Sequence, residues 1–458
     1  MLLPFSFRQV LPNVTVGDPR PRGSERGSIY NRIAMGAYRV PKLNLRRERI
    51  EITVPSSKSM ANRALILSAL SAGSFRVDGD FLADDIQIMI QSLQKLGIAV
   101  ESDERGLRFQ NDLSWRENSE EIELFLGNSG TSMRFLSALV TLRKGITILT
   151  GKERMKERPI GDLVNALRDL GVEVEYLEKE GYPPLRVVGR GSVPGGSIQM
   201  KGDVSSQFLS ALLLAGSAFD EGLEIELEGE LISKPYVEMT MRMIEEWGMK
   251  NEKWKMKNGK LRMKVSPVSF QGHDYQVEGD ASAAVYWWAL GFLQNAEVIV
   301  RNVPDDSVQG DVGFRQLLKK VETGLKPVST RLDMSDMPDA SLMLMAIAPM
   351  LMFPIRIEGI ASLRIKETDR IEAMVTELRK LGGRVETGED WIMIYPMDLD
   401  KYQVLQNVQI DTYDDHRVAM SMAILGTRLG NLEILDRDCV NKTYPGFWEE
   451  LERISKNP

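Results

Sequence analysis

The chain has 458 residues, 43% of them hydrophobic and 27% charged, which is typical of a soluble globular protein with two or three domains. A formal net charge of −7 gives no reason to expect nucleic acid or an acidic membrane as partner, and no apolar run approaches the roughly 18 residues of a membrane span. The single cysteine, Cys439, excludes an intrachain disulfide and fits the reducing cytoplasm, and two histidines argue against a Cys/His metal site.

Residues 1–45 are predicted to be disordered or loosely attached, because they are rich in Pro, Gly and Arg and show no sustained periodicity. The short apolar start breaks at Arg8, which is poor for a secretory signal. A transit peptide is one interpretation of this Arg-rich segment, but we favour a vector-derived or misassigned start with Met35 as the true initiator.

From about residue 50 onward, one unit of two helices recurs six times. Its first half is a polar turn followed by a helix of small and apolar residues, as in "SSKSMANRALILSALSAG", and its second half is an amphipathic helix that often closes on glycine. The closing glycines Gly97, Gly171, Gly248 and Gly324 are 74, 77 and 76 residues apart, and each suits the position after a helix. Strand-like pieces such as "GITILTG" separate the helices. The pattern predicts an α/β (α+β) fold with two domains of three units each.

Several of the small-residue helices begin with a residue type that commonly caps a helix N-terminus. These candidate caps are Asn128 or Ser129, Ser205, Asp280, Asp339 and Asp415. If the repeat directs these N-termini toward one cleft between the domains, their backbone N–H groups create a site that attracts anions.

Cationic residues recur at the turns of the repeat: Lys58, Arg63, Arg134, Arg158, Lys366, Arg370, Arg417 and Lys442. In "SLRIKETDRIEAM", which reads as the start of a helix, Lys366 and Arg370 lie four residues apart on one helical face, where like charges repel. For this stretch alone, a solvated face of mixed charge and a bound anion both remain open. Because guanidinium groups bind carboxylate and phosphate in a bidentate way, the recurrence of cations favours one shared polyanion site.

Other phosphate and nucleophile chemistries fit less well. The sequence lacks the G-x-x-x-x-G-K-[ST] pattern of a P-loop, and "GNSGTS" alone is a weak glycine-rich signal. His416 either contacts a ligand or fills a core turn, and both alternatives stay open.

Ten stretches occur in the order found in one enzyme family: "KSMANRALILSAL", "GNSGTSMRFL", "RMKERPIGDLVNAL", "SSQFLSALLLAG", "SKPYVEMT", "EGDASAA", "MPDAS", "KETDRIEAM", "DDHRVAM" and "KTYPGF". From about residue 45 to its end, the chain resembles 5-enolpyruvylshikimate-3-phosphate (EPSP) synthase. The resemblance implies an enolpyruvyl transferase-like fold of six βαβαββ units, three per domain, joined by a two-stranded hinge. Units one to three would occupy 57–277, and the other domain would combine 46–56 with 278–458.

The family transfers the enolpyruvyl group of phosphoenolpyruvate to the 5-hydroxyl of shikimate 3-phosphate, in the shikimate pathway of aromatic amino acid biosynthesis. The resemblance implies these two small-molecule partners, no metal or organic cofactor, and inhibition by glyphosate, and we expect a monomer. The hydroxyl adds to C2 of phosphoenolpyruvate as C3 is protonated, and phosphate leaves as C3 gives its proton back. One carboxylate must therefore accept a proton while another donates one.

Matching the motifs residue by residue implies two binding sets and three catalytic residues. The shikimate 3-phosphate set is Lys58, Ser59, Arg63, Ser205, Ser206, Gln207, Ser233, Tyr236, Asp339, Ser362 and Lys366. The phosphoenolpyruvate set is Lys58, Gly130, Arg158, Gln207, Arg370, Arg417 and Lys442. Asp339 resembles the acceptor of the 5-hydroxyl proton, Glu367 the residue that exchanges protons with C3, and Lys58 a cation that offsets charge on the leaving phosphate.

Two positions depart from the family pattern. Ser362 stands where members commonly have Asn, and Phe135 stands where many have Pro. Gly130 matches the pattern, whereas glyphosate-tolerant members often carry Ala there. Phe135 either alters the packing behind the phosphoenolpyruvate pocket or points into the core without effect on the site.

Two rivals remain on sequence grounds. UDP-N-acetylglucosamine enolpyruvyl transferase shares the sixfold architecture, but it usually has a Cys or Asp in a mobile loop of the first domain and lacks "KETDR". A non-catalytic anion-binding scaffold belongs to a different functional class. Phosphate release from shikimate 3-phosphate plus phosphoenolpyruvate separates all three interpretations.

Overall fold

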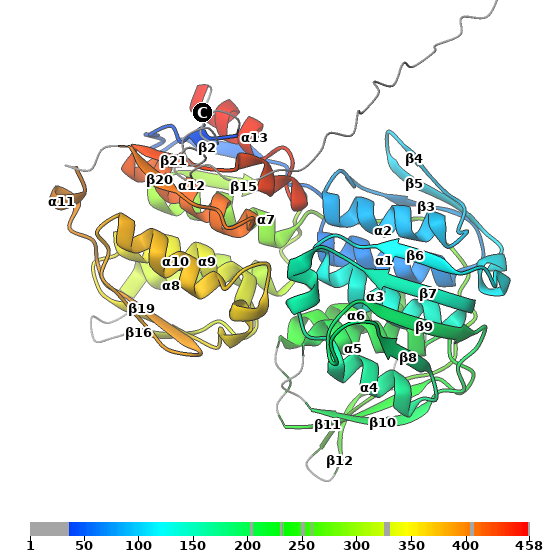
Figure 1. Ribbon diagram of the computed structural model, residues 1–458. Helices are drawn as coiled ribbons and strands as arrows, with labels where there is room; N and C mark the ends of the chain where they lie inside the picture. Colours follow the sequence, from blue (N-terminus) through cyan, green and yellow to red (C-terminus); the bar gives the residue numbers. More distant parts are fainter. Residues whose placement is uncertain are drawn as a thin grey trace, which may run out of the picture.

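The computed structural model describes residues 36–201, 205–229, 231, 233–248, 252–257, 260–324, 330–403 and 407–456. Figure 1 shows two lobes: one holds the chain coloured light blue to green, and the other holds the yellow to red chain together with the blue strand β2 (Arg49–Ile52). Most of the predicted N-terminal extension lies outside the described residues.

The described part of the first lobe contains three four-stranded sheets, each with one parallel and two antiparallel strand pairs. In spatial order they are β14 (Tyr275–Gln276), β3 (Gly73–Asp78), β5 (Gly106–Asn111) and β4 (Val100–Asp103); β6 (Ile122–Phe125), β7 (Lys144–Thr150), β9 (Leu185–Arg190) and β8 (Glu173–Tyr176); and β10 (Gly196–Lys201), β11 (Leu223–Glu228), β13 (Lys260–Val265) and β12 (Glu252–Lys257). This constant pairing pattern is what three copies of one unit produce.

The helices of the first lobe come in pairs, as the repeat predicts. The small-residue helices are buried along almost their whole length, because Ala, Ser and Gly permit close packing: α1 (Lys58–Leu70), α3 (Gly130–Leu139) and α5 (Ser206–Gly216). The amphipathic partners bury one face: α2 (Asp84–Lys95), α4 (Gly161–Asp169) and α6 (Lys234–Glu246). Buried side chains from Met60 to Val277 form one hydrophobic cluster.

Among its described residues, the second lobe has sheets of four, three and two strands. They are β16 (Thr330–Asp333), β17 (Ile355–Glu358), β19 (Trp391–Ile394) and β18 (Val385–Thr387); β1 (Tyr38–Arg39), β21 (Leu432–Ile434) and β20 (Val408–Ile410); and β15 (Glu297–Val300) with β2. The four-stranded sheet repeats the pairing pattern of the first lobe, so the two lobes are variations on one unit.

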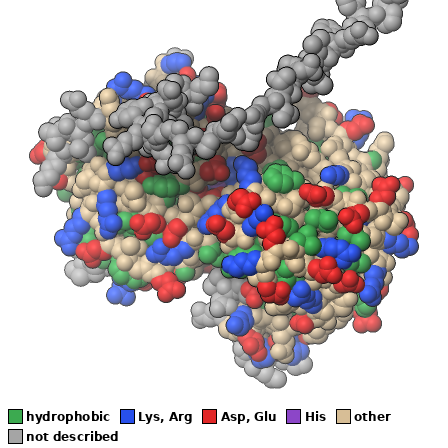
Figure 2. Space-filling model, in the orientation of Figure 1, with side chains coloured by type: hydrophobic (Ala, Val, Ile, Leu, Met, Phe, Trp, Pro, Cys, Tyr) green, Lys and Arg blue, Asp and Glu red, His purple; other side chains and the backbone are tan. Residues whose placement is uncertain are grey.

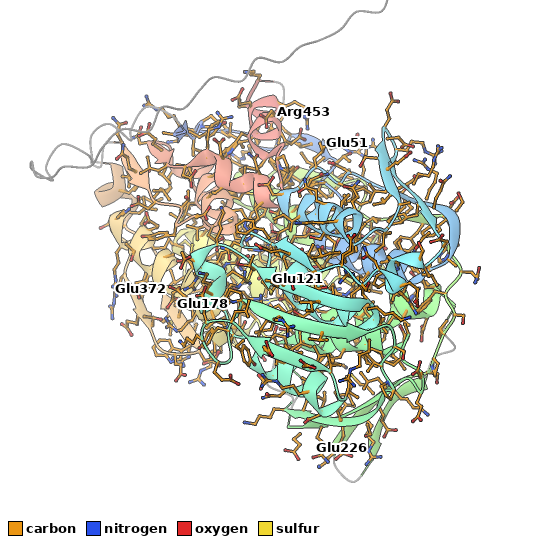
Figure 3. All side chains as sticks on the ribbon, turned by 45° about the vertical axis from the view of Figure 1, so that its right-hand side comes forward. Glu51, Glu121, Glu178, Glu226, Glu372 and Arg453 are labelled. Atoms are coloured by element: carbon orange, nitrogen blue, oxygen red, sulfur yellow. The ribbon has the colours of Figure 1, made fainter. Side chains whose placement is uncertain are left out.

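Buried helices again lie under these sheets: α7 (Ala281–Gln294), α9 (Ser341–Ile347) and α12 (His416–Leu429). The remaining helices are α8 (Phe314–Gly324), α10 (Arg370–Lys380), α11 (Leu399–Gln403) and α13 (Phe447–Lys456). A second hydrophobic cluster extends from Tyr38 to Ile454 and is separate from that of the first lobe. At its surface, Arg453 Nη2 donates to Glu51 O at 3.0 Å and ties α13 to β2 (Figure 3).

The structure corrects the prediction of disorder for residues 36–45. β1 pairs with β21, and Val40 N donates to Leu432 O at 3.0 Å. Val40 and Leu45 are both only 3% exposed. Their apolar pattern is too short to stand out from the Pro- and Arg-rich residues before them, so composition alone places the boundary too late.

The chain passes between the lobes at two adjacent places. Ser57 N donates to Glu278 O at 2.8 Å, and Asp280 N donates to Pro55 O at 2.8 Å. This pairing agrees with the two-stranded connection that the resemblance implies. No helix of the described residues is long and apolar enough to cross a membrane.

Glycines predicted to follow a helix do so at points where the chain turns sharply. Gly97 and Gly171 follow α2 and α4 with φ of 99° and 82°, a conformation that other residues adopt with strain. Gly324 differs, because it is the last residue of α8.

Candidate active site

A cavity of about 380 Å³ lies where the two lobes meet, and both lobes line it. Every residue of the predicted binding and catalytic sets except Lys442 lies in its wall. Among the described lining residues, seven are Lys or Arg and four are Asp or Glu, so the cavity carries an excess of three positive charges. Figure 2 shows basic and acidic side chains interspersed along the seam between the lobes. An acidic protein thus concentrates positive charge at one internal site.

Among the small-residue helices of the described chain, four contribute their first turns to this cavity, as the repeat predicts. They are α1, α3, α5 and α12. Ser205 and Asp415 cap α5 and α12 with their side chains, and Asp280 caps α7, which confirms these three predicted caps. Asp339 is no cap: it lies in a 3-10 turn, η6 (Pro338–Ala340), and its carboxylate makes ion pairs instead.

Lys58 is the first residue of α1 and lies close to a carboxylate that sequence reasoning missed. Its Nζ is 3.2 Å from Asp85 Oδ2, and the side chain of Asp85 is only 5% exposed. The Lys58 backbone N–H donates to Asp280 Oδ2 at 3.0 Å, which links α1 to the segment that joins the lobes. Asp85 is in the "DDIQ" start of the next helix, and only the fold brings it to Lys58.

Arg63 is buried one turn further along α1 without a carboxylate partner among the described residues. It donates from Nε to Thr240 Oγ1 at 2.7 Å and from Nη2 to Ser210 Oγ and Tyr236 O, both at 3.0 Å. Nη1 donates to Ser59 O at 2.7 Å. A guanidinium carries five N–H hydrogens, so one hydrogen of Nη1 stays available beside the cavity. Burial lowers the pKa of Arg63 to about 10.

Two more arginines of the first lobe are held by carbonyl oxygens. Arg134 donates to Gly130 O at 3.1 Å and to Pro159 O at 3.0 Å, and Arg158 donates to Asn128 O at 3.0 Å. Burial and the charge of Arg158 lower the pKa of Arg134 well below its usual value. A Cβ on Gly130 would lie 2.4 Å from Arg158 Nη2, so the glycine makes room for this guanidinium.

The uncharged predicted residues fill the rest of the first wall. Gln207 Nε2 donates to Thr131 Oγ1 at 3.2 Å, and Ser205 Oγ accepts from Gln207 N at 3.4 Å. Ser233 Oγ donates to Ser335 O at 3.5 Å, a contact between the lobes. Ser206, Tyr236 and the unpredicted Thr131 also line the cavity from this lobe, and Ser362 lines it from the second lobe. Hydroxyl and amide groups therefore surround the unpaired arginines.

The second lobe builds its wall from ion pairs. Arg370, 1% exposed, lies 2.7 Å from Asp415 Oδ2, 3.0 Å from Asp339 Oδ1 and 2.9 Å from Glu367 Oε2. Arg417 Nη2 is 2.9 Å from Asp339 Oδ2. Both candidate proton-transfer carboxylates are thus held by guanidinium groups.

Lys442, the predicted residue that does not line the cavity, contacts Glu367 from outside the cavity wall. Its Nζ is 3.0 Å from Glu367 Oε1 and donates to Asn128 O at 3.1 Å. It lies in a 3-10 turn, η9 (Arg437–Lys442), of the second lobe. Lys442 therefore contacts the candidate catalytic carboxylate and the first lobe at once.

The stretch "SLRIKETDRIEAM" is not one helix from its start. Residues Ala361–Ile365 form a 3-10 turn, η8, and α10 begins only at Arg370, where Asp369 caps it by accepting from Glu372 N at 3.1 Å. Lys366 and Arg370 therefore do not share a helical face, and that prediction is wrong. The bent peptide between the two elements places Lys366 and Glu367 at the cavity instead.

The charges around the carboxylates set their protonation. Burial alone would raise the pKa of Asp339, but Arg417, Lys366 and Arg370 lower it below its usual range. The same balance lowers the pKa of Glu367, where Lys442, Arg370 and Arg158 oppose burial. Both groups are carboxylate anions near neutral pH.

His416 is the first residue of α12 and is fully buried, with no hydrogen-bond partner among the described residues on either ring nitrogen. Burial and the charges of Arg417 and Lys58 hold its pKa well below the usual value. It does not line the cavity, so the structure favours the packing alternative over ligand contact.

Phe135 has features of both alternatives that the sequence leaves open, a core residue and a residue behind the substrate pocket. Its ring is 1% exposed in the core, yet it also lines the cavity. The Arg63 guanidinium carbon lies 5.4 Å from the ring centroid. The aromatic face therefore supports a buried arginine of the first wall.

The described residues contain no cluster of three or more His, Cys, Asp or Glu side chains suited to a metal ion.

Comparisons with known proteins agree with this geometry. A family model described as EPSP synthase (3-phosphoshikimate 1-carboxyvinyltransferase) matches residues 46–451. The chain belongs to the EPSP synthase family. A curated 3-phosphoshikimate 1-carboxyvinyltransferase from Mannheimia haemolytica is 40% identical over 433 residues, which cover 88% of this chain and 96% of the relative. One from Vibrio campbellii is 39% identical over 422 residues, with the same coverage.

A solved EPSP synthase structure from Acinetobacter baumannii covers 92% of this chain and 98% of that protein, with a TM-score of 0.72 at 23% identity. The likeness shows that this family member has the two-lobed fold of that structure. The predictions of family and fold class made from the sequence are confirmed.

Proposed function

We propose that the protein transfers the enolpyruvyl group of phosphoenolpyruvate to the 5-hydroxyl of shikimate 3-phosphate and releases phosphate. The observation that carries this proposal is the cavity between the lobes, which combines an excess of cations with two guanidinium-held carboxylates, Asp339 and Glu367. Two polyanionic substrates need the cations, and an addition followed by an elimination needs the carboxylates. The curated relatives carry the name of this activity.

Shikimate 3-phosphate is assigned to the first wall. Arg63 keeps a free N–H beside the cavity, and Ser59, Ser205 and Ser206 offer donors nearby. Tyr236 also lines the cavity, and its aromatic ring offers an apolar group for contact with a carbon ring. A ring with a carboxylate, a phosphate and hydroxyls fits this mixture of donors and one aromatic face.

Phosphoenolpyruvate is assigned to the space between the walls, where Arg158, Arg370 and Arg417 bring cations from both lobes. Lys442 adds positive charge from outside the wall through its contact with Glu367. The phosphate and carboxylate of phosphoenolpyruvate would take over some of the contacts that these cations now make with protein carboxylates. Lys58, held by Asp85, is placed to offset charge on the departing phosphate.

The carboxylates then divide the proton transfers. The 5-hydroxyl oxygen bonds to C2 as its proton passes to Asp339, while C3 takes a proton from Glu367. In the second half, Glu367 takes a proton back from C3, the C2–O bond to phosphate breaks, and phosphate leaves with the electron pair. The departing phosphate takes up the proton that Asp339 accepted, so both carboxyl groups return to their starting states. Every proton and electron pair is accounted for by substrates and these two side chains.

Glu367 must hold a proton to begin, although in the empty site its pKa is well below the usual value. The cause of the lowering is Lys442, Arg370 and Arg158, acting against burial. Anionic phosphoenolpyruvate offsets the same cations, so its binding raises the pKa of Glu367 toward that of a useful acid.

The two hydrophobic clusters support a division into two domains, 57–277 and 46–56 with 278–458, and the ordered residues from 38 onward extend the second domain. A monomeric state and a cytoplasmic location remain predictions from the sequence.

Phosphate release tests the proposal. The purified protein is expected to release phosphate with shikimate 3-phosphate plus phosphoenolpyruvate, and not with UDP-N-acetylglucosamine plus phosphoenolpyruvate. Activity with the UDP sugar alone would identify the sister enzyme. Tight binding of both proposed substrates without phosphate release would identify a scaffold.

A further inference from the structure

One arginine outside both predicted binding sets joins the two lobes at the catalytic segment. Arg154 lies in a 3-10 turn, η4 (Glu153–Glu157), of the first lobe. Its Nε lies 3.3 Å from Lys366 O and 3.2 Å from Glu367 O, and its Nη2 donates to Lys366 O at 3.0 Å. The acceptors are in the second lobe, more than 200 residues away along the chain.

The accepting carbonyls belong to the two residues whose side chains enter the cavity. Lys366 and Glu367 lie on the short peptide between η8 and α10, which has no helix hydrogen bonds of its own to fix it. Bonds from a planar guanidinium to two successive carbonyls restrict both the position and the rotation of this peptide. The origin of the Glu367 side chain is thereby set from the opposite lobe.

Glu367 is then held at both of its ends by groups that span the lobes. Its backbone carbonyl accepts from Arg154, and its carboxylate lies 3.0 Å from Lys442, which also donates to Asn128 O in the first lobe. The Arg154–Glu367 and Lys442–Asn128 contacts exist only when the lobes are together, whereas Lys442 and Glu367 both belong to the second lobe. Arg154 has no contact with the cavity itself, because it does not line it.

We propose that Arg154 is a positioning residue that couples the approach of the lobes to the placement of Glu367 and Lys366 for reaction. The proposal rests on the proposed function. Seven cationic side chains against four carboxylates line the cavity, so repulsion among them opposes the approach of the lobes and weakens the Arg154 contacts. Anionic substrates relieve this repulsion, so their binding strengthens the contacts that fix the catalytic peptide.

The variants separate this role from that of a surface ion pair. Arg154 also donates from Nη1 to Glu157 Oε2 at 2.7 Å, within the first lobe. Arg154→Ala removes both kinds of contact, Arg154→Lys keeps the charge but loses the planar fork, and Glu157→Gln weakens only the contact within the lobe. Glu157 is therefore the matched control.

We expect Arg154→Ala to lower kcat about 10- to 100-fold, the range for displacing a catalytic group by about 1 Å, while the Kd of shikimate 3-phosphate alone changes less than about threefold. The kcat of Arg154→Lys should lie between that of Arg154→Ala and that of the parent protein. Free guanidinium ion should restore part of the kcat of Arg154→Ala, whereas Glu157→Gln should retain the parent kcat. A merely structural role predicts no such rescue.

Hydrogen exchange separates failure of this proposal from failure of the proposed function. Without any substrate, the amides of residues 362–369 should exchange faster in Arg154→Ala than in the parent protein, and not in Glu157→Gln. A parent protein that turns over nothing but shows this exchange difference would overturn the function and leave the contact in place. An Arg154→Ala protein with near-parent kcat, unchanged exchange or no guanidinium rescue would overturn the positioning role.

Discussion

The two walls of the cavity treat arginine in opposite ways. In the first lobe, Arg63, Arg134 and Arg158 are held by hydroxyls and carbonyl oxygens, and no carboxylate of the described residues pairs with them. In the second lobe, Arg370 and Arg417 each pair with carboxylates. The first wall thus presents arginines without a carboxylate partner among the described residues, and the second presents arginines that are already paired.

The pKa shifts express the same contrast. Burial lowers the pKa of Arg63 to about 10. Burial would also lower the pKa of Arg370, but Asp415, Glu367 and Asp339 raise it above its usual value. Burying an uncompensated charge costs free energy that a bound anion can return. The first wall is therefore suited to recognition, and the second to holding carboxylates ready for proton transfer.

The largest expected effect comes from removing charge on the second wall. Asp339→Asn and Glu367→Gln should each lower kcat roughly 100-fold or more, the scale of a lost general acid or base. Binding of shikimate 3-phosphate should persist in both variants, because the first wall is untouched. Steady-state phosphate release and equilibrium binding measure the two quantities.

Glu372→Gln is the control for the glutamate change, since Glu372 follows on α10 but does not line the cavity. It should keep the parent kcat. Near-parent turnover in either Asp339→Asn or Glu367→Gln would mean that the carboxylate serves only to hold its arginine.

Changing the first wall should affect binding more than turnover. Arg63→Lys keeps a positive charge but has three N–H donors in place of five, so it cannot keep the four protein contacts of Arg63 and also donate to the ligand. We expect the Kd of shikimate 3-phosphate to rise about 10- to 100-fold, the equivalent of one charged hydrogen bond, with a smaller change in kcat. Isothermal calorimetry without phosphoenolpyruvate measures this Kd directly.

The matched control is Arg242→Lys, an exposed arginine on α6 paired with Glu246. Its Kd for shikimate 3-phosphate should equal that of the parent protein. If Arg63→Lys lowered kcat strongly and left the Kd unchanged, the division of labour between the walls would be wrong.

The sequence predicted the elements that local pattern controls. Small-residue helices such as α1 and the capping of α12 by Asp415 are visible in the chain itself. The start of α10 at Arg370 was missed, because Asp369 is one of several polar residues in a row and the turn before it depends on tertiary contacts. Ordered residues 36–45 were missed because their partner strand is β21, at the far end of the chain.

The candidate site was predictable where motifs carry it, and not where pairing across the fold decides it. The family motifs named the residues of the cavity wall, but Asp85 and Arg154 were left out. Asp85 matters through its 3.2 Å contact with Lys58, and Arg154 through carbonyls of the opposite lobe. Neither pairing has a signature in local sequence, because each joins separate elements.

A pH experiment sharpens the contrast within the second lobe. Asp311 is 3% exposed and accepts from Ser282 Oγ, but its Oδ1 has no hydrogen-bond partner among the described residues. Burial raises the pKa of Asp311 to about 6, although Arg417 acts to lower it. The pKa of Asp311, which lacks a direct arginine contact, is thus raised, whereas the pKa of Asp339 is lowered.

The folded protein binds this proton more tightly than the unfolded chain, so its contribution to stability is present at about pH 4 and is lost as the pH rises toward 6. The difference of about two pH units corresponds to roughly 3 kcal/mol. In Asp311→Asn this loss is absent, so the stability of the variant relative to the parent should increase from pH 4 to pH 7. Urea unfolding at several pH values measures it, and a pH-independent difference would refute the assignment.

The smallest expected effect concerns the aromatic face behind the first wall. Phe135→Leu keeps α3 intact and removes the ring that Arg63 faces at 5.4 Å. A cation–π contact contributes about 0.5–1 kcal/mol or more, so the Kd of shikimate 3-phosphate should rise about two- to fivefold. Phe109→Leu is the control, because its ring stacks on Phe75 in the core of the same lobe and does not line the cavity.

Inhibition by glyphosate tests whether Phe135 also affects the phosphoenolpyruvate site. Gly130 leaves room for Arg158, and on that residue alone the protein should be sensitive. Phe135 lies one helical turn beyond Thr131, so a change of ring moves the turn that carries Gly130. A small shift weakens the binding of a rigid inhibitor more than that of a substrate whose contacts are remade in the transition state.

We therefore expect intermediate sensitivity to glyphosate, with Phe135→Pro lowering the inhibition constant of glyphosate more than the KM of phosphoenolpyruvate. Proline inside α3 also removes a helix hydrogen bond, so Phe135→Leu is measured beside it. An unchanged ratio of the two constants in both variants would mean that Phe135 acts only through Arg63 and that Gly130 sets the response.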